Sequence, residues 1–597
     1  MNKIRTVYLS LKLSIKLVFD SKEGFKYSIL KCVIALFNSS IPMAYTIIPG
    51  LIINELLYNK RIVVLAIYVG LLALIPLSKD IINIFANRCI YSLEKDLSLK
   101  LLSDFYLYIL GMDYETLENP DLQEEQWRAR STYTNSVGTI DLIIELFAST
   151  VAAIVYLFII AKYNWIIALL LFVFGCINYY VKRNVKKQSF KTNKEIDKIE
   201  RKLSTLSYMF DQTDYGKEFR VLNLKEYLVE KFITLKKAMN SIELTQYKKN
   251  NKIGITNSLL NAFQVVFIYF VLISKIVRGV LPVGDLSIGL SASNQFNGKL
   301  KAVFDSYLQL YEKSLYVQDM SHFFSISNCN IAKGNQIPDF KNDSIIEFKN
   351  VSFRYPGSNI FALKNLNIVI KANERICLVG QNGSGKSTFI KLLLRLYLPT
   401  SGEIYLNGKN INEYDYQKYQ KLFSPVFQDF VEYEFTAKEN IILNLPEDCK
   451  KIKRVLTETN LHQLFEKLPN GIETQVGKYV DPEGIELSGG EAQRMAIARA
   501  LYREGVIYVL DEPTAALDPM AEYEIYTQFH NMIKDKTAIL VTHRLSAVQL
   551  ADKVAVFDDG QIIEYGTHSE LYSKGGKYKE MFDKQSEFYV NANLDNK

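Results

Sequence analysis

Five long apolar runs in the first half of the chain constrain its fold more than any other feature. A helix that crosses ~30 Å of hydrocarbon needs about 20 mostly apolar residues. The runs are Cys32–Asn54, Ile62–Ser78, Leu146–Ile160, Tyr163–Val181 and Ile253–Ser274. They are too long and too close together for the core of one soluble domain, and buried helices of a globular domain are the weaker interpretation. The pattern therefore predicts an all-α polytopic membrane domain.

A sixth span over Val283–Leu310 is more polar than the others. Its polar residues are Asp285, Asn294, Gln295, Asn297, Lys299, Lys301 and Asp305. We expect it because the N-terminal segment and the soluble second half belong on the same side of the membrane, which requires an even number of crossings. A span this polar must face protein or a water-filled cavity. It is predicted to line a substrate path, although the part from Lys299 onward equally fits an extension outside the membrane.

The N-terminal residues predict a surface helix rather than a signal peptide. Lys12 and Lys16 interrupt what would be the apolar core of a signal peptide. Apolar residues recur there at helical spacing: Ile4, Val7, Tyr8, Leu11, Ile15, Val18 and Phe19. This stripe indicates an amphipathic helix lying on the membrane, and the alternative is a helix packed on protein.

Two long connections lie between the spans, over residues 79–140 and 182–252. Both retain helical periodicity, so we expect helices that extend beyond the membrane, with tips near Asp113–Arg130 and Thr213–Leu228 as docking candidates. The basic residues that follow the fourth span place that connection on the cytosolic side. Asp141 and Glu145 share one helix face, which fits either an acidic mouth for a cationic substrate or a solvated helix end.

Composition argues against several other classes of protein. The net charge of +7 is spread along the chain, which does not favour a nucleic-acid binder. None of the six cysteines lies within four residues of another, and the five histidines form no cluster, so no zinc site or redox pair is indicated.

The first motif of the soluble half is a glycine-rich loop. The strand Arg375–Val379 leads into it, and a helix follows from Ser387, so backbone donors at the helix start point at phosphate. Lys386 is expected to contact the β- and γ-phosphates, and the Ser387 hydroxyl to bind Mg²⁺. The predicted phosphate-binding residues are Gly380, Gln381, Asn382, Gly383, Ser384, Gly385, Lys386, Ser387 and Thr388.

A second motif supplies the other half of an ATP site. Leu487 is followed by Ser488, Gly489, Gly490 and Glu491, and the apolar strand Val506–Leu510 ends at Asp511 and Glu512. Asp511 is expected to orient Mg²⁺, and Glu512 is placed as the general base that activates the attacking water.

The segment from about 340 to 585 resembles the nucleotide-binding domains of ABC transporters, with every motif in the expected order. The resemblance implies that Tyr355 stacks on adenine and that Gln428 senses Mg²⁺ and the attacking water. It also implies that Ser488 to Gly490 reach the γ-phosphate from another subunit, that Asp518 lies in the turn contacting that subunit, and that His543 contacts the γ-phosphate. Each site would then need a second copy of the chain, or a paralogous half-transporter.

The fused arrangement resembles ABC exporters, and short motifs around Tyr355 and Gln428 resemble the bacterial branch that secretes lantibiotics and related peptides. No cysteine-peptidase segment precedes the spans, so leader cleavage is not expected of this chain. Lys478 stands where multidrug-type exporters carry an acidic residue after Gly477, which puts that coupling contact in doubt. The rival interpretations are a lipid flippase or multidrug exporter, a soluble ABC ATPase acting on nucleic acid or ribosomes, and an ATP-gated channel or sensor.

The sequence thus predicts a multi-domain exporter in the plasma membrane, with ATP and Mg²⁺ as cofactors and no nucleic-acid partner. Its fold class is an all-α membrane domain of six transmembrane helices followed by an α/β P-loop nucleotide-binding domain. The predicted boundaries are a surface helix at 1–25, the membrane domain at 26–325, a linker at 326–343, the nucleotide-binding domain at 344–585 and a polar tail at 586–597.

Overall fold

The computed structural model describes residues 12–326, 334–479, 481–512, 533, 536–542, 548 and 551–591. The chain divides into two compact units. The first comprises Met1–Leu110 and Gln123–Ile326, and the second comprises Gly111–Leu122 and Ser327–Lys597. The short segment Gly111–Leu122, which the sequence analysis placed within the membrane domain, therefore packs with the second unit.

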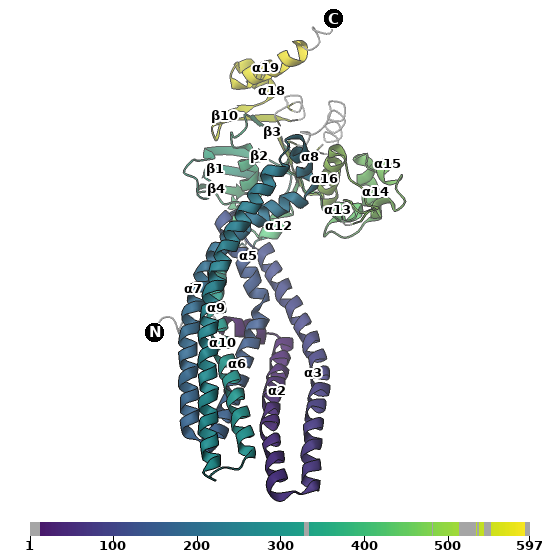
Figure 1. Ribbon diagram of the computed structural model, residues 1–597. Helices are drawn as coiled ribbons and strands as arrows, with labels where there is room; N and C mark the ends of the chain where they lie inside the picture. Colours follow the sequence, from purple (N-terminus) through teal and green to yellow (C-terminus); the bar gives the residue numbers. More distant parts are fainter. Residues whose placement is uncertain are drawn as a thin grey trace. The chain divides into compact units, whose positions relative to one another are not determined.

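The first unit is built from long helices (Figure 1). In chain order its described elements are α2 (Lys22–Asn54), the π-helical turn η1 (Glu55–Asn59), α3 (Ile62–Leu110), α5 (Pro120–Thr134, whose first turn belongs to the second unit), α6 (Ser136–Tyr163), α7 (Trp165–Asp211), α8 (Thr213–Val221), α9 (Lys225–Val277) and α10 (Gly284–Ile326). Helices α2 and α3 lie side by side, as do α7 and α9. The expected helical extensions are present, because α3, α7 and α9 each continue well beyond their apolar runs.

Four helical stretches in the described part of the chain are long and apolar enough to cross a membrane, by length and composition. They are Lys22–Asn59, Ile62–Leu110, Ser136–Tyr163 and Lys225–Val277. The predicted fourth span falls on the start of α7, where the apolar stretch Trp165–Ile177 is shorter. Helix α10 does not have the required hydropathy among the described residues, as its polar sequence led us to expect. Six crossings stay a prediction.

Two polar residues of α10, Asp285 and Asn297, have hydrogen-bond partners inside the first unit. The Gln264 amide of α9 donates to Asn297 at 3.1 Å, and the Asn54 amide of α2 donates to Asp285 at 3.1 Å. Ser293 is almost completely buried. These contacts agree with the expectation that Asp285 and Asn297 face protein, whereas Asn294 and Lys301 of the same helix are exposed.

Asp141 of α6 is paired within the same unit. The Tyr27 hydroxyl donates to one carboxylate oxygen at 2.7 Å, and Lys31 lies 3.5 Å from the other. The carboxylate of Asp141 is therefore not simply solvated at a helix end, and its charge is not left uncompensated at the entrance of a substrate path. Near Tyr27, Val18 is fully buried whereas Ile15 and Phe19 are exposed, so the described part of the N-terminal helix packs one face on protein. Ile4, Val7, Tyr8 and Leu11 lie outside the described residues.

The second unit contains two sheets. A four-stranded sheet has the order β2-β1-β4-β5, and a six-stranded sheet has the order β10-β9-β3-β8-β7-β6. The strands are β1 (Ile345–Phe353), β2 (Leu363–Lys371), β3 (Arg375–Gly380), β4 (Ser401–Leu406), β5 (Lys409–Asn410), β6 (Phe423–Val426), β7 (Ile507–Asp511), β8 (Thr537–Val541), β9 (Lys553–Asp558) and β10 (Gln561–Gly566).

The larger sheet is parallel except at β10, which pairs antiparallel with β9. Every residue of β7 and β8 is buried, which is why these strands read as continuous apolar runs rather than alternating ones. The described α-helices of this unit are α4 (Tyr114–Leu117), α11 (Lys386–Leu393), α12 (Tyr416–Gln420), α13 (Ala437–Ile442), α14 (Cys449–Glu458), α15 (His462–Phe465), α16 (Gly489–Arg503), α18 (His568–Lys574) and α19 (Lys577–Asn591).

Two apolar clusters form most of the core of this unit. One joins both sheets to α11 and includes Phe348, Phe389 and Ile539. The other surrounds α16 and joins it to α13, α14, β7 and β8. Helices α13 to α16 are inserted between the neighbouring strands β6 and β7 and gather together (Figure 1). This insertion places the Ser488 motif on a helical subdomain, while the glycine-rich loop lies on the larger sheet.

Candidate nucleotide site

The glycine-rich loop leads from β3 into α11, and its backbone requires glycine at two positions. Gly385 has φ +107°, and a Cβ there would lie 2.7 Å from Leu363 Cδ2 and 2.8 Å from the Ala362 carbonyl oxygen. At Gly380, with φ +153°, a Cβ would lie 2.3 Å from the Phe557 carbonyl oxygen. The loop is thus held close to neighbouring backbone, as a phosphate cradle requires.

Lys386 lies buried at the start of α11. Its ammonium donates to the carbonyl oxygens of Gly380 at 2.8 Å and Gln381 at 2.9 Å. Burial lowers the pKa of Lys386, and the charges of Glu512 and Asp511 oppose that shift. The cation is thus held inside the loop by two neutral acceptors, which phosphate oxygens can replace.

Asp511 ends β7 and is 6% exposed. Burial, followed by the charge of Glu512, raises the pKa of Asp511 to about 6, although a hydrogen bond from Ser387 and the charge of Lys386 act in the opposite direction. Within the described part of the chain, Asp511 Oδ1 and Ser384 Oγ are buried and have no hydrogen-bond partner. Asp511 thus offers a buried carboxylate oxygen without a partner, and its carboxyl group also interacts with the Ser387 hydroxyl; these two oxygen donors fit Mg²⁺.

Glu512 is brought to Gln428, which lies 84 residues earlier in the chain. The Gln428 amide donates to Glu512 Oε2 at 3.0 Å, and the Glu512 backbone N–H donates to the Val541 carbonyl at 3.0 Å. Glu512 has φ +48°, a left-handed conformation that costs a side-chain-bearing residue roughly 1–2 kcal/mol. Such strain is typical of functional positions, because the surrounding structure must impose it.

Tyr355 lies beside α11, where its hydroxyl is 3.0 Å from the Thr388 hydroxyl. The ring of Tyr397 meets it edge to face with centroids 5.5 Å apart, and the Lys391 ammonium lies 5.5 Å from the Tyr355 ring centroid. The sequence analysis missed Lys391 and Tyr397, since no motif marks them. The predicted adenine-binding residue thus belongs to a cluster of aromatic and cationic side chains.

Two side chains of the segment Gly111–Leu122, Glu118 and Tyr114, join this cluster. Glu118 accepts a hydrogen bond from the Tyr397 hydroxyl, and Lys391 lies 3.5 Å from its carboxylate. The Tyr114 ring meets Tyr397 edge to face at 5.7 Å. Burial raises the pKa of Glu118, but these hydrogen bonds and the Lys391 charge outweigh it and lower the pKa overall. The predicted docking role of the tip near Asp113 is supported by these contacts.

The second motif forms the N-terminus of α16. The Ser488 backbone N–H and hydroxyl both donate to the Glu491 carboxylate, at 2.8 Å and 2.7 Å. The spacing Ser-x-x-Glu is the signal of a capping box, and it could have identified this role for Glu491 from the sequence. Gly489 and Gly490 form the first turn. The carboxylate of Glu491 therefore orders the start of the helix.

Not every predicted site residue can be placed. Asp518 and His543 lie outside the described residues, so their roles stay predictions. Gln381, Asn382 and Gly383 are exposed on the loop, where a ligand can reach them. Lys478 is exposed, and its effect on coupling also stays a prediction.

Comparisons with known proteins decide the family. The ABC transporter family model matches residues 363–515. The subtilin transport ATP-binding protein SpaT of Bacillus subtilis is 29% identical over 96% of this chain and 94% of its own length. The nisin transport ATP-binding protein NisT of Lactococcus lactis is 29% identical over 96% of each chain. The chain is an ABC exporter with fused membrane and nucleotide-binding domains.

A solved structure gives the same fold for the exporter. The structure of a bacterial Atm1-family ABC exporter with ATP bound covers 95% of this chain and 99% of its own, with a TM-score of 0.80 and 20% identity. A lipid A-core flippase of Paraburkholderia xenovorans is 29% identical over 70% of this chain. The prediction of an ATPase coupled to transport is confirmed, and the ABC domain implies ATP as the nucleotide.

Proposed function

We propose that two copies of the exporter, or one copy with a paralogous half-transporter, form two composite ATP sites. In each site the loop Gly380–Ser387 of one subunit holds the phosphates, and Ser488 to Gly490 of the other subunit cover the γ-phosphate. Mg²⁺ would be held by Ser387, Asp511 and Gln428, and it would neutralise charge on the phosphates. The Asp511 oxygen without a partner supports this assignment.

Glu512 then acts on water. Its carboxylate, oriented by the Gln428 amide, accepts a proton from the water that attacks the γ-phosphate. Lys386 exchanges its two carbonyl partners for phosphate oxygens, and Tyr355 stacks on adenine. His543 and Asp518 complete the site in this proposal. ATP thus favours closed cassettes, and hydrolysis removes that preference.

Closure drives alternating access of six membrane helices per copy, in the plasma membrane, with the cassettes in the cytosol. The contacts of Glu118 with Tyr397 and Lys391 support a role for Gly111–Leu122 in transmitting the state of the site. The polar partners of α10, such as Asn297 with Gln264, support a role for this helix inside the bundle and near the cargo path.

The cargo is a peptide of the lantibiotic class, exported from the cytoplasm. One observation carries this proposal: the chain matches subtilin and nisin transport proteins over 96% of its length, which includes the membrane half. The similarity to a flippase supports a lipid as the second candidate. A fungal multidrug transporter, atrD, matches over only 54% of this chain, so it says less about the membrane half.

The experiment that tests the cargo uses the full-length exporter in proteoliposomes. ATPase stimulation is measured with nisin-like cationic peptides, with lipid A-type lipids and with hydrophobic dyes, and ATP-dependent uptake of each is followed in inside-out vesicles. We expect peptides to stimulate and to accumulate, with Glu512→Gln vesicles as the inactive control. ATPase stimulation by lipids alone would contradict the proposal of a peptide cargo. ATPase activity without accumulation of any cargo would favour a channel or sensor.

A further inference from the structure

The helical subdomain of the cassette is joined to the larger sheet at two chain junctions. Because β6 and β7 are neighbours, the inserted residues leave the sheet after Val426 and return to it before Ile507. The first junction carries Gln428, which hydrogen-bonds the proposed base Glu512. The second junction follows α16 directly and begins at Glu504, for which the proposed mechanism has no role.

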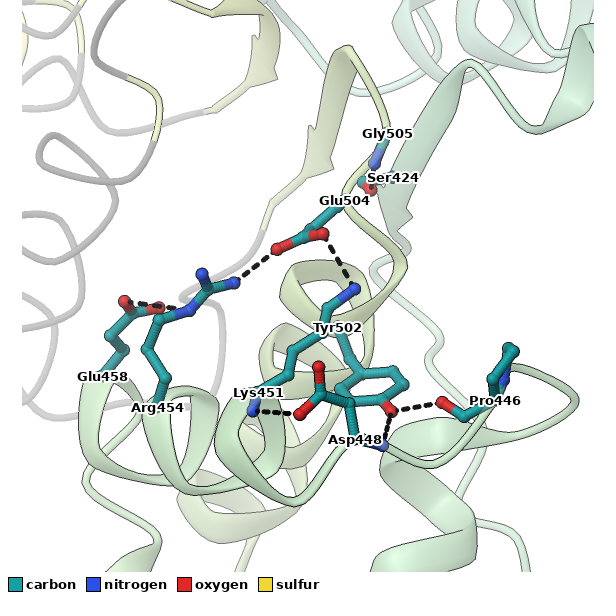
Figure 2. Close-up of polar contacts among 9 residues, drawn as sticks. All are labelled: Ser424, Pro446, Asp448, Lys451, Arg454, Glu458, Tyr502, Glu504 and Gly505. Atoms are coloured by element: carbon teal, nitrogen blue, oxygen red, sulfur yellow. Dashed lines mark hydrogen bonds and ion pairs between the residues drawn. The ribbon is translucent and has the colours of Figure 1, made fainter.

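Glu504 is held by two cations from another helix (Figure 2). Its carboxylate lies 2.8 Å from Lys451 Nζ and 2.5 Å from Arg454 Nη2, both on α14. Hydrogen bonds from Lys451 and then Arg454 hold the pKa of the Glu504 carboxyl below its usual value. Glu504 also adopts φ +53°, ψ +42° as the C-terminal cap of α16.

The left-handed conformation makes glutamate an unusual choice at this cap. Glycine, or sometimes asparagine, normally occupies such a position at a helix end, since a side chain there is strained. Gly505 follows immediately, yet the left-handed residue is Glu504. A strained residue whose carboxylate is bound by two cations suggests that the side chain has a role of its own.

Further contacts anchor the same end of α16 on both sides. The Gly505 N–H donates to Ser424 Oγ of β6 at 2.8 Å, and Ser424 is fully buried. On the other side, the Tyr502 hydroxyl donates to the Pro446 carbonyl at 2.6 Å and accepts from the Asp448 N–H at 2.9 Å (Figure 2). Glu504 thus lies where α14, α16 and the β6–β7 edge of the sheet meet.

The far end of α16 carries the Ser488 motif, so a small tilt at Glu504 is amplified there. A helix of 15 residues is about 22 Å long at 1.5 Å per residue. A tilt of about 5° at Glu504 would move Ser488 by about 2 Å. Functional contacts tolerate only about 0.5 Å.

We infer that Glu504 is a positioning residue for ATP hydrolysis, which acts by binding Lys451 and Arg454 and so fixing the angle of α16. The angle determines whether Ser488 to Gly490 meet the nucleotide of the partner subunit. This inference rests on the proposed composite site. An ion pair with only a stabilising role is the competing explanation, and half-exposed pairs of this kind contribute little to stability.

Glu504→Gln tests the inference, with Glu458→Gln as the matched control. Glu458 pairs with the same Arg454 at 3.7 Å but lies on α14 itself, away from the junction. In reconstituted full-length exporter we expect Glu504→Gln to lower kcat at least fivefold, with binding of a fluorescent ATP analogue changed less than twofold. Glu458→Gln should alter neither. If Glu504→Gln does not fold, Lys451→Met with Arg454→Gln replaces it, with the same expected result.

A double-mutant cycle and a cross-link separate positioning from stability. In a Lys451→Met, Arg454→Gln background, Glu504→Gln should have no further effect on kcat. Cysteines at Asn382 and Ser488, in a chain without its native cysteines, should cross-link between subunits when ATP is added. Failure of the cross-link with native Glu504 would overturn the composite site itself. A normal cross-link and normal kcat with Glu504→Gln, even at a lowered melting temperature, would overturn only the role of Glu504.

Discussion

The burial of Asp511 leads to a prediction about stability as well as catalysis. Its pKa is raised to about 6 in the folded chain, chiefly by burial and then by the charge of Glu512, from a reference value of 3.8. An acid whose pKa is raised on folding favours the folded state in its protonated form. Ionisation of Asp511 therefore destabilises the nucleotide-free protein, increasingly as the pH rises from about 4 to 6 and fully above that range.

The magnitude follows from the shift. A shift of about two pKa units corresponds to about 3 kcal/mol of lost folding free energy above pH 7. At pH 5 the group is largely protonated in the folded chain, and the penalty is smaller by roughly 1 kcal/mol. Asp511→Asn removes the ionisable group with little change in shape. We expect it to stabilise the nucleotide-free protein at pH 8, and to do so less at pH 5.

Calorimetry of the full-length protein in detergent measures this effect. For a domain of this size 1 kcal/mol shifts the melting temperature by about 2–4 °C, so an increase of about 5 °C or more is expected at pH 8. Asp558→Asn, which changes an exposed carboxylate at the end of β9, is the control and should have no such effect. A destabilised Asp511→Asn protein, or an equal shift at both pH values, would refute the reasoning. The same variant should lose Mg²⁺-dependent ATPase activity.

Three other predictions follow from the site. Glu512→Gln should lower ATPase activity at least 100-fold while nucleotide binding persists, and phosphate release at the native rate would remove Glu512 from the mechanism. Gly385→Ala should abolish ATP binding because its Cβ would meet the Ala362 carbonyl at 2.8 Å. Gly408→Ala, where φ is also positive (+75°) but nothing lies within 4 Å of the added Cβ, should bind normally. Glu118→Gln should reduce cargo uptake in vesicles more than basal ATPase activity, and an equal reduction of both would argue against a coupling role.

Local signals in the sequence were sufficient for the glycine-rich loop and the strand before it. Gly385 and Lys386 fall where the motif requires, because loop geometry and helix start are encoded within a few residues. The apolar run before Asp511 predicted a buried parallel strand for the same reason. Long apolar runs likewise predicted helices, although Trp165–Ile177 shows that hydropathy alone does not fix where a helix ends.

Contacts between segments that are distant in the sequence could not be predicted from such local signals. Glu118 and Tyr397 are separated by 279 residues, and neither belongs to a motif. Their pairing depends on the packing of Gly111–Leu122 with the cassette, which no periodicity encodes. The bond between Gln428 and Glu512 has the same origin, since it requires β6 and β7 to be neighbours. Glu504 was missed because its role depends on cations from another helix.

The site combines features that a stable fold would avoid. Asp511 and Glu512 place two carboxylates side by side, one of them buried, and Glu512 adopts a left-handed conformation. Lys386 is close enough to lower the pKa of Asp511, but it is held by carbonyl oxygens rather than by a carboxylate. Within the described part of the chain, Lys386 therefore offsets the negative charge at Asp511 only in part, since the pKa of Asp511 is still raised to about 6. In the proposed site a divalent cation arriving with nucleotide would supply positive charge beside Asp511, so the cost in the empty state would become a preference for the metal–nucleotide complex.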